Sequence, residues 1–557
     1  MFTKTNGAAV QGIDALMIKI EVSVEQGFGF CIVGLPDTAV KESYQRILSA
    51  VKMCGIEFPR RKVVVNMSPA DVKKEGSAYD LPLAIAVLAA DEKVTADRLE
   101  RFMLMGELSL DGSLQPIKGV LPMAIKAREH GLDGIIVPKA NVMEAAVVNN
   151  LNVYGADNIL EVIGFFNNTY DLQPTVVDTR EMFRRQVDHF DFDFSEVKGQ
   201  EIVKRAFEVA CAGGHNILLI GSPGSGKSMM AKRLPSILPP LTLQEALETT
   251  KIHSVAGKLK QGSMLMTQRP FRSPHHTISP VALVGGGSYP TPGEISLAHN
   301  GILFLDEFPE FSRQVLEVMR QPLEDRHITI SRAKYTVDYP AGFMLVASMN
   351  PCPCGYYNHP TKQCICAPGA VQHYLNRISG PLLDRIDLQV EVAPVEFDDI
   401  SSTAPAESSA AIRERVIRAR EIQTRRYEGI KGVHCNAQMT TALMHQYAQP
   451  DAAGLEKLKD AMTRFNMSAR AYDRILRVAR TIADLEGSDR VLTYHIQEAI
   501  GYRNLDRGGY RLPQPRPRQL GRAQDVLTKA FCDWFLTLQK EEQFNRNIPL
   551  ARRKRTA

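Results

Sequence analysis

The sequence predicts an α/β protein with a nucleotide-binding domain in the middle of the chain. The apolar run at residues 217–220 leads directly into the Gly-rich octet GSPGSGKS at 221–228, and the residues that follow, 229–234, suit a helix. This order of strand, loop and helix is that of a P-loop. A second apolar run, at 302–305, ends in Asp306 and Glu307, as expected of a buried parallel strand. With 557 residues, the chain has room for about three domains.

The octet has the residue types that binding of a nucleoside triphosphate requires. Its glycines allow tight turns, so that successive backbone N–H groups converge on phosphate oxygens at the start of a helix. Lys227 is then placed for the β- and γ-phosphates, and Ser228 for a magnesium ion. The predicted cofactors are therefore ATP and Mg²⁺. The predicted nucleotide-binding residues are Gly221, Ser222, Pro223, Gly224, Ser225, Gly226, Lys227 and Ser228.

Composition is that of a globular protein without membrane segments. Hydrophobic residues make up 44% and charged residues 23% of the chain, and no apolar run approaches the roughly 18 residues of a membrane-spanning helix. The first residues lack the apolar core of a signal peptide, so we expect a cytoplasmic location. Nine cysteines over this length do not suggest a disulfide scaffold.

Positive charge is concentrated at the end of the chain. Residues 501–557 contain 13 Lys/Arg and 5 Asp/Glu, and the run from Arg552 to Arg555 is entirely basic. This tail suits contact with nucleic acid, and it equally suits a solvated chain end.

The first 166 residues predict a mixed α/β domain. Strand patterns occur at 17–24, 28–33, 62–66, 102–110 and 134–137, and helical patterns at 40–53, 81–90 and 123–130. Residues 167–191 have little apolar periodicity and are expected to form a linker.

Two segments of this first domain resemble the Lon-protease-like domain (ribosomal protein S5 domain 2-like). They are NMSPADVKKEGSAYDLPLAIAVL at 66–88 and GELSLDGSLQPIKGVLPMAIKAREHGL at 106–132. Lon proteases pair a serine nucleophile with a lysine. The alignment puts Ala78 at the serine position and Leu121 at the lysine position, while Ser77 and Lys118 are displaced from them. We therefore expect a Lon-like fold without peptidase chemistry.

The second half of the nucleotide site is expected from two further strand ends. Asp306 would hold magnesium and Glu307 would polarise the attacking water, because both follow a buried strand about 80 residues after the P-loop. A second buried strand at 342–349 ends at Asn350, whose amide can orient that water.

The order of these motifs resembles that of an AAA+ module, in which Asn350 corresponds to sensor 1. The resemblance implies that Arg385, in PLLDRIDL at 381–388, is an arginine finger that reaches the nucleotide of a neighbouring subunit. A local ion pair of Arg385 with Asp384 or Asp387 is the alternative. Arg470, in SARA at 468–471, matches the sensor 2 arginine, acting in cis or in trans. We expect the AAA+ domain at 192–395, an α-helical lid at 396–507 and a basic extension at 508–557.

Three longer segments resemble the YifB/ComM family of magnesium-chelatase-like AAA+ ATPases. They are RPFRSPHHTIS at 269–279, VGGGSYPTPGEISLAHNG at 284–301 and NPCPCGYYNHP at 350–360. The resemblance implies a homo-oligomeric ring, expected to be a hexamer, that acts on DNA as a branch-migration helicase in recombination or natural transformation. The alternative is a protein-remodelling motor like the magnesium-chelatase ATPase subunit, and an ATP-dependent protease is disfavoured by Ala78 and Leu121.

Two loops are candidates for contact with the substrate. Residues 327–337 predict a β-hairpin with Lys334 at its tip, and hairpins at this place in related hexameric helicases contact DNA phosphates. The alternative for Lys334 is an exposed lysine in a turn. Residues 285–290 (GGGSYP) suit a second moving loop or a plain surface loop.

Four cysteines just after Asn350 are spaced as two C-x-C pairs. Thiolates of Cys352, Cys354, Cys364 and Cys366 can close a tetrahedral zinc site, with His359 or His373 as substitutes. Reduced buried thiols and a redox-labile pair are the alternatives. The adjacent His275 and His276 are interpreted as structural or near the nucleotide.

Overall fold

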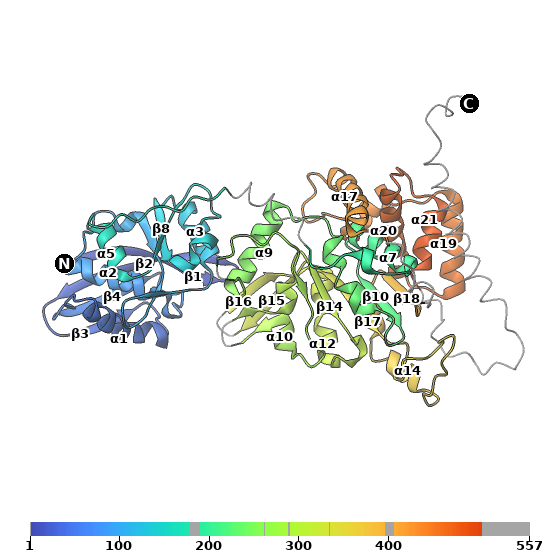
Figure 1. Ribbon diagram of the computed structural model, residues 1–557, viewed down its shortest axis with the longest axis horizontal. Helices are drawn as coiled ribbons and strands as arrows, with labels where there is room; N and C mark the ends of the chain where they lie inside the picture. Colours follow the sequence, from blue (N-terminus) through green and yellow to red (C-terminus); the bar gives the residue numbers. More distant parts are fainter. Residues whose placement is uncertain are drawn as a thin grey trace, which may run out of the picture. The chain divides into compact units, whose positions relative to one another are not determined.

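A computed structural model describes residues 2–178, 190–260, 262–287, 290–332, 335–395 and 406–503. In these ranges the chain forms two α/β regions and a C-terminal group of helices, which confirms the predicted fold class (Figure 1). Buried apolar side chains form two clusters, one within residues 8–172 and one within 194–502. None of the described helices combines the length and the hydropathy needed to span a membrane.

The N-terminal region is built on a mixed sheet of seven strands in the order β3-β4-β2-β1-β5-β8-β9. β2 runs antiparallel to both of its neighbours, β1 and β4, and the remaining pairs are parallel. The strands are β1 (Phe2–Gln11), β2 (Asp14–Glu25), β3 (Gly29–Val33), β4 (Lys62–Ser68), β5 (Phe102–Leu104), β8 (Gly134–Pro138) and β9 (Asn152–Ala156).

Five α-helices accompany this sheet, and every residue of α2 is buried. The helices are α1 (Thr38–Met53), α2 (Asp80–Ala90), α3 (Val120–Glu129), α4 (Val142–Ala145) and α5 (Ile159–Phe166).

The strand predicted at 102–110 is interrupted. β5 ends at Leu104, and β6 (Glu107–Leu108) pairs instead with β7 (Leu114–Gln115). The chain leaves the sheet because Gly106 donates its N–H to Ala78 O at 2.8 Å and accepts the N–H of Leu81 at 3.0 Å.

The second sheet has five parallel strands in the order β11-β14-β17-β10-β18. They are β10 (Ile217–Gly221), β11 (Phe271–Arg272), β14 (Ile302–Leu305), β17 (Met344–Met349) and β18 (Leu388–Val392). Its helices are α7 (Glu201–Gly213), α8 (Lys227–Ala231), α9 (Leu243–Val255), α10 (Pro280–Val284), α11 (Glu294–Leu297), α12 (Arg313–Val318), α13 (Arg320–Asp325), α14 (Ala370–Leu375) and α15 (Gly380–Leu383). Because the strands are parallel, their carboxyl ends meet at one edge of the sheet.

Two hairpins project from this region. β15 (His327–Arg332) pairs antiparallel with β16 (Tyr335–Pro340), so the hairpin expected at 327–337 is present. The short strands β12 (Gly285–Gly286) and β13 (Thr291–Pro292) form the second pair. Lys334 itself, and Ser288 and Tyr289 in the second loop, lie outside the described residues.

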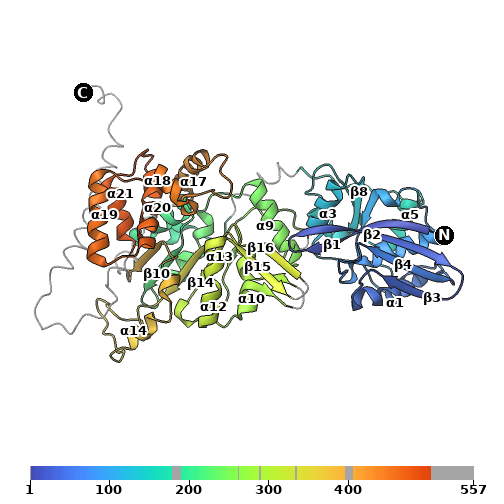
Figure 2. The ribbon, with the colours of Figure 1, turned by 180° about the vertical axis from the view of Figure 1, so that it is seen from behind.

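The C-terminal helices are α17 (Ser409–Arg426), α18 (Thr441–Tyr447), α19 (Ala452–Phe465), α20 (Ala469–Leu485) and α21 (Thr493–Gly501). Helix α7 contacts β18 and also α17 and α20, so it connects the parallel sheet to this lid (Figure 1). Figure 2 shows the lid helices from behind.

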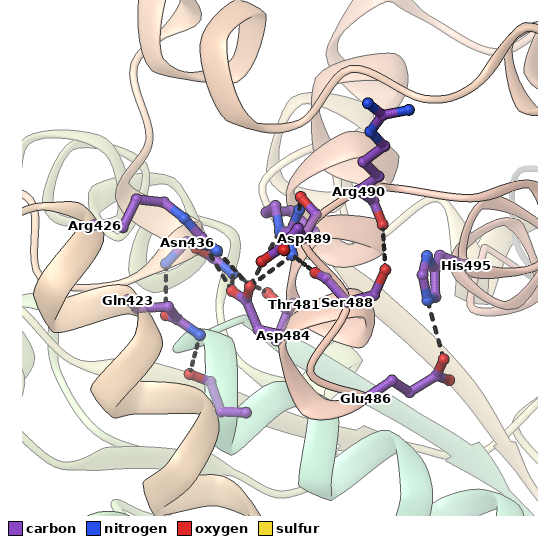
Figure 3. A network of polar contacts seen from close by, with 12 residues as sticks. Gln423, Arg426, Asn436, Thr481, Asp484, Glu486, Ser488, Asp489, Arg490 and His495 are labelled. Atoms are coloured by element: carbon purple, nitrogen blue, oxygen red, sulfur yellow. Dashed lines mark hydrogen bonds and ion pairs between the residues drawn. The ribbon is translucent and has the colours of Figure 1, made fainter. Parts of the chain in front are cut away.

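A buried carboxylate ties the lid helices together. Asp484 on α20 pairs with Arg426 of α17 at 2.5 Å and with Arg480 at 2.8 Å, and it accepts a hydrogen bond from Asn436 Nδ2 at 2.8 Å (Figure 3). Its side chain is fully buried, so both charges and hydrogen bonds must be satisfied within the protein. The lid is therefore held by a polar network as well as by apolar packing.

Candidate functional site

The Gly-rich loop connects the carboxyl end of β10 to helix α8. Gly224 and Gly226 have φ values of 80° and 87°, which side chains with a Cβ rarely adopt, and Gly226 directly precedes α8. The local order of strand, loop and helix is thus the one expected from the octet, although the helix ends at Ala231 and is shorter than the pattern at 229–234 suggested.

Lys227 folds back over the loop that carries it. Its Nζ donates to the carbonyl oxygens of Gly221 at 2.8 Å and Ser222 at 2.9 Å, and lies 3.3 Å from Asn350 Oδ1. Burial lowers the pKa of Lys227, and the nearby Asp306 carboxylate opposes that shift. The ammonium group therefore sits in the loop with Asn350 at its side.

Ser228 and Asp306 face each other across the strand ends. Ser228 Oγ donates to Asp306 Oδ2 at 2.5 Å, while Asp306 Oδ1 accepts from the Ser348 hydroxyl and from Glu307 N, the latter at 3.0 Å. A hydroxyl and a carboxylate oxygen held this close are the ligand types that Mg²⁺ takes. The residues present fit a magnesium ion next to the loop.

Glu307 follows Asp306 with its side chain 58% exposed, so water can reach it. Its backbone is left-handed, with φ of 52°. His276 Nδ1 lies 3.3 Å from Glu307 Oε2, and the His276 ring lies against His275 with ring centroids 4.1 Å apart. Of the two interpretations of the histidine pair, the structure thus favours a position near this site, and His276 becomes an additional candidate residue.

Sheet topology explains why these side chains meet. β14, β17 and β10 are neighbours, with Leu305 opposite Ala347 and Ile220 opposite Met349. Asp306, Asn350 and the Gly-rich loop each follow one of these strands, so all three leave the sheet at the same edge. Residues more than 100 positions apart in the chain are brought together in this way.

Arg385 and Arg470 lie elsewhere. Arg385 precedes β18 and therefore lies at the amino-terminal edge of the sheet, where Asn216 Nδ2 donates to Arg385 O at 3.1 Å. Its guanidinium pairs with Glu324 at 2.6 Å, not with Asp384 or Asp387. A strand of five residues separates this edge from the P-loop edge by about 17 Å.

Arg470 lies close to the Arg385 segment. It is the second residue of helix α20, is 60% exposed and reaches Asp384 at 3.7 Å. The structure therefore groups Arg385 and Arg470 with each other and separates them from Lys227 of the same chain.

The four cysteines after Asn350 converge. Their Sγ atoms all lie within 4.8 Å of one another, with 3.3 Å between Cys352 and Cys354 and 3.7 Å between Cys352 and Cys364. A tetrahedral zinc ion with Zn–S bonds of about 2.3 Å would hold its sulfurs about 3.8 Å apart. Neither His359 nor His373 belongs to this group among the described residues.

This cysteine cluster packs against the Gly-rich loop. Gly355 has φ of 83°, and a Cβ there would lie 2.4 Å from Pro223 Cδ. The loop between the two C-x-C pairs therefore touches the phosphate-binding loop directly.

The residues aligned with the Lon serine and lysine do not form a serine–lysine pair. Leu121 is buried in α3 and Ala78 lies in the turn before α2. Ser77 donates its hydroxyl hydrogen bond to Glu107, and Lys118 is exposed. Among the described residues, the hydrogen-bond partner of the Ser77 hydroxyl is thus a carboxylate and not the lysine that the dyad uses.

Comparison with known families and proteins gives consistent matches along the chain. The family model described as "Magnesium chelatase, subunit ChlI" matches residues 193–400, "Subunit ChlI of Mg-chelatase" matches 20–141, and "Magnesium chelatase, subunit ChlI C-terminal" matches 406–503.

Individual relatives match over most of their length. The protein YifB of Escherichia coli (strain K12) is 43% identical over 502 residues, which cover 90% of this chain and 96% of YifB. Competence protein ComM of Haemophilus influenzae is 41% identical over 502 residues, 90% of this chain and 97% of ComM. DNA replication licensing factor Mcm6 of Drosophila melanogaster is 22% identical over 538 residues, 88% of this chain and 60% of Mcm6.

Proposed function

This chain belongs to the YifB/ComM family of magnesium-chelatase-like AAA+ proteins, and from that premise we propose that it is a ring-forming ATPase that acts on DNA. One observation supports ATP hydrolysis. At one edge of the parallel sheet, the structure brings together Lys227, Ser228, Asp306, Glu307 and Asn350.

Each of these residues has a distinct role in the proposed reaction. Lys227 would contact the β- and γ-phosphates, and Ser228 with Asp306 would hold a magnesium ion, which would supply positive charge to the transferred phosphate. Glu307, exposed beside them, polarises the attacking water, and Asn350 orients it.

The arrangement of arginines supports an oligomer. Arg385 and Arg470 lie at the edge of the sheet opposite the P-loop. In a ring, they would therefore face a nucleotide bound to a neighbouring subunit. We propose that Arg385 acts as the arginine finger in trans, with Arg470 beside it, and that the ring is a hexamer. For Arg385 to reach a neighbouring phosphate, its ion pair with Glu324 must open.

Action on DNA is supported by the relatives rather than by a described contact. One relative is named a competence protein and another a DNA replication licensing factor. The hairpin of β15 and β16 would present Lys334 to DNA phosphates. Branch migration in recombination or natural transformation is the activity we propose. The magnesium-chelatase family models favour a second candidate, a motor that remodels a protein partner.

The ATPase rate with and without DNA tests these alternatives. We expect single-stranded or four-way-junction DNA to raise the rate, and added salt to reduce that stimulation, because phosphate contacts release counterions. If no DNA changes the ATPase rate at low salt, the result would favour the second candidate, a motor that remodels a protein partner. No hydrolysis under any condition would refute the ATPase itself.

We also propose that Cys352, Cys354, Cys364 and Cys366 bind one zinc ion as a structural site. The spacing of the sulfurs supports zinc, and the contact of Gly355 with Pro223 indicates what the ion would stabilise, the outer side of the P-loop.

Metal analysis of reduced, purified protein tests this site. We expect about one zinc per chain, lost in the double variant Cys364→Ser/Cys366→Ser and retained in Cys31→Ser, which changes an isolated exposed cysteine. Well under one zinc per wild-type chain would reject the site.

A further inference from the structure

A cavity of about 450 Å³ lies on the side of the parallel sheet opposite the P-loop. Gly214 and Asn216 before β10, Gly301 before β14 and Met344 at the start of β17 form its floor. The lid helices α17 and α20 contribute the other side. The cavity is therefore separate from the proposed ATP site and lies between the AAA+ core and the lid.

Arginines dominate the charged lining of this cavity. Arg269 and Arg326 come from the core, and Arg420, Arg474 and Arg477 come from the lid. Only three carboxylates line the same space, those of Glu245, Glu324 and Asp387, which leaves two positive charges in excess.

The carboxylates are already engaged. Glu245 pairs with Arg269 at 3.2 Å and Asp387 with Arg474 at 2.9 Å. Glu324 pairs with Arg385. No carboxylate of the lining therefore remains to form an ion pair with Arg326, Arg420 or Arg477.

Three arginines remain without a carboxylate partner within the described part of the chain. Arg420 donates one hydrogen bond, to Cys211 O at 2.9 Å. Arg326 and Arg477 make no side-chain hydrogen bond or ion pair there, and the Nε atoms of Arg420 and Arg477 are buried without a partner. Burial lowers the pKa of Arg326 and Arg477, and Arg474 lowers both further.

This arrangement suits an anion. Arg326, Arg420 and Arg477 are half-buried and keep their charge, and the buried Nε atoms of Arg420 and Arg477 have no partner, so a bound anion would complete their hydrogen bonding. Guanidinium groups bind phosphate oxygens in bidentate pairs, and a phosphate monoester carries nearly two negative charges at neutral pH. The volume falls within the range of small-molecule pockets, but it is too small for a nucleic-acid duplex.

We propose that this cavity binds a small phosphate monoester, up to the size of a nucleoside monophosphate, between the core and the lid. Arg326 from the end of α13 and Arg477 from α20 approach the phosphate from the two sides. Because one arginine belongs to each part, bound phosphate holds the lid against the core and stabilises the folded protein.

The test uses full-length Lys227→Ala protein, so that the P-loop does not contribute, and inorganic phosphate, ribose 5-phosphate and AMP as probes. We expect saturable binding by calorimetry and a rise in Tm with probe concentration. Adding Arg326→Ala and Arg477→Ala should weaken binding about tenfold or more, because charged hydrogen bonds are lost. Arg418→Ala, an exposed arginine on α17, is the matched control.

The variants also separate ligand binding from a structural role. Arg326 and Arg477 are half-buried and have no carboxylate partner among the described residues. Replacing either with Ala should therefore leave the Tm without ligand unchanged, whereas removal of a structural ion pair would lower it. Arg326→Gln gives a milder second variant. A lowered Tm in all of these variants, or no binding of any probe to Lys227→Ala, would overturn the proposal. Equal affinity of the three probes would identify free phosphate as the ligand. Tighter binding of AMP would identify a nucleotide as the ligand.

ATPase activity gives an independent readout. Loss of the cavity site does not remove any proposed ATPase residue, so the proposed function and this inference fail or succeed separately.

Discussion

Glu307 is the exposed carboxylate next to the proposed magnesium ligands, and its replacement tests the proposed hydrolysis directly. We expect Glu307→Gln to bind ATP normally, because the amide removes a base and leaves the loop intact. Hydrolysis should fall by about 100-fold or more, the usual contribution of a general base. Single-turnover hydrolysis with a fluorescent-nucleotide binding assay separates the two quantities.

The control for this variant is Glu310→Gln, three residues on, where the carboxylate pairs with Arg377 on the surface. Its rate should remain close to that of the wild type. Normal turnover of Glu307→Gln would assign the water-activating role to another group, with His276 as the nearest candidate.

Single residues differ in how well the sequence predicts their surroundings. Lys227, Asp306 and Asn350 were predictable as neighbours because each ends a buried strand of one parallel sheet, and topology then fixes the contact. The partner of Arg385 was not predictable, since Glu324 belongs to a helix about 60 residues earlier and no local pattern joins the two. The same holds for His276, whose neighbour Glu307 is set by tertiary packing.

Helix α20 carries a row of arginines with different environments. Arg470 is exposed, Arg474 pairs with Asp387, Arg477 lines the cavity and Arg480 pairs with Asp484 within the helix. Their spacing of three or four residues was visible in the sequence, but the partners come from other elements. The spacing does not show which of these arginines are buried, because exposed and buried arginines occur on the same helix.

The pair of Asp387 and Arg474 connects the core sheet to α20 and should contribute to stability. Burial would raise the pKa of Asp387, but Arg474 and His215 outweigh it and hold the pKa well below its usual range. A carboxyl with a lowered pKa stabilises the fold above its unfolded pKa of about 3.9, and this contribution is lost as the pH falls through the folded value.

We therefore expect Asp387→Asn to be less stable than the wild type by about 3–5 kcal/mol at neutral pH, as for a broken buried pair. The difference should shrink as the pH falls below about 4, because the unfolded chain then binds a proton at this carboxyl that the folded wild type does not. Thermal unfolding across a pH series measures it, with the exposed Asp460→Asn as control. A constant difference down to low pH would show that Asp387 acts through hydrogen bonding alone.

Strand β1 shows where strand prediction from the sequence was incomplete. Phe2–Gln11 contains buried polar residues, among them Thr5, bonded to Pro82 O at 3.4 Å, and Asn6, bonded to Glu100 O at 2.8 Å. These groups interrupt the apolar alternation that marks a strand, and their burial is possible only because α2 and its surroundings supply acceptors. The strongly alternating β2 next to it was predicted within three residues at its start and one at its end.

For the whole molecule, the position of Arg385 at the far edge of the sheet leads to a test of the proposed site shared between subunits. Lys227→Ala removes the P-loop lysine and keeps Arg385, while Arg385→Ala keeps the P-loop and removes the finger. If Arg385 acts in trans, each variant alone is inactive. In a random 1:1 mixed ring about one quarter of the interfaces then combine an intact loop with an intact arginine. If Arg385 acts within its own chain, no complete site forms in the mixture.

ATPase activity of the two variants, measured separately and after mixing under conditions of subunit exchange, decides between these cases. We expect recovery to about one quarter of the wild-type rate, because interfaces are the catalytic units. The same mixture with Arg470→Ala in place of Arg385→Ala decides whether the lid arginine acts in cis or in trans. The control is Arg490→Ala, which changes an exposed arginine after α20. This variant should hydrolyse ATP without being mixed with another variant. No recovery with Arg385→Ala would contradict a site shared between subunits, since both variants retain everything else that the site requires.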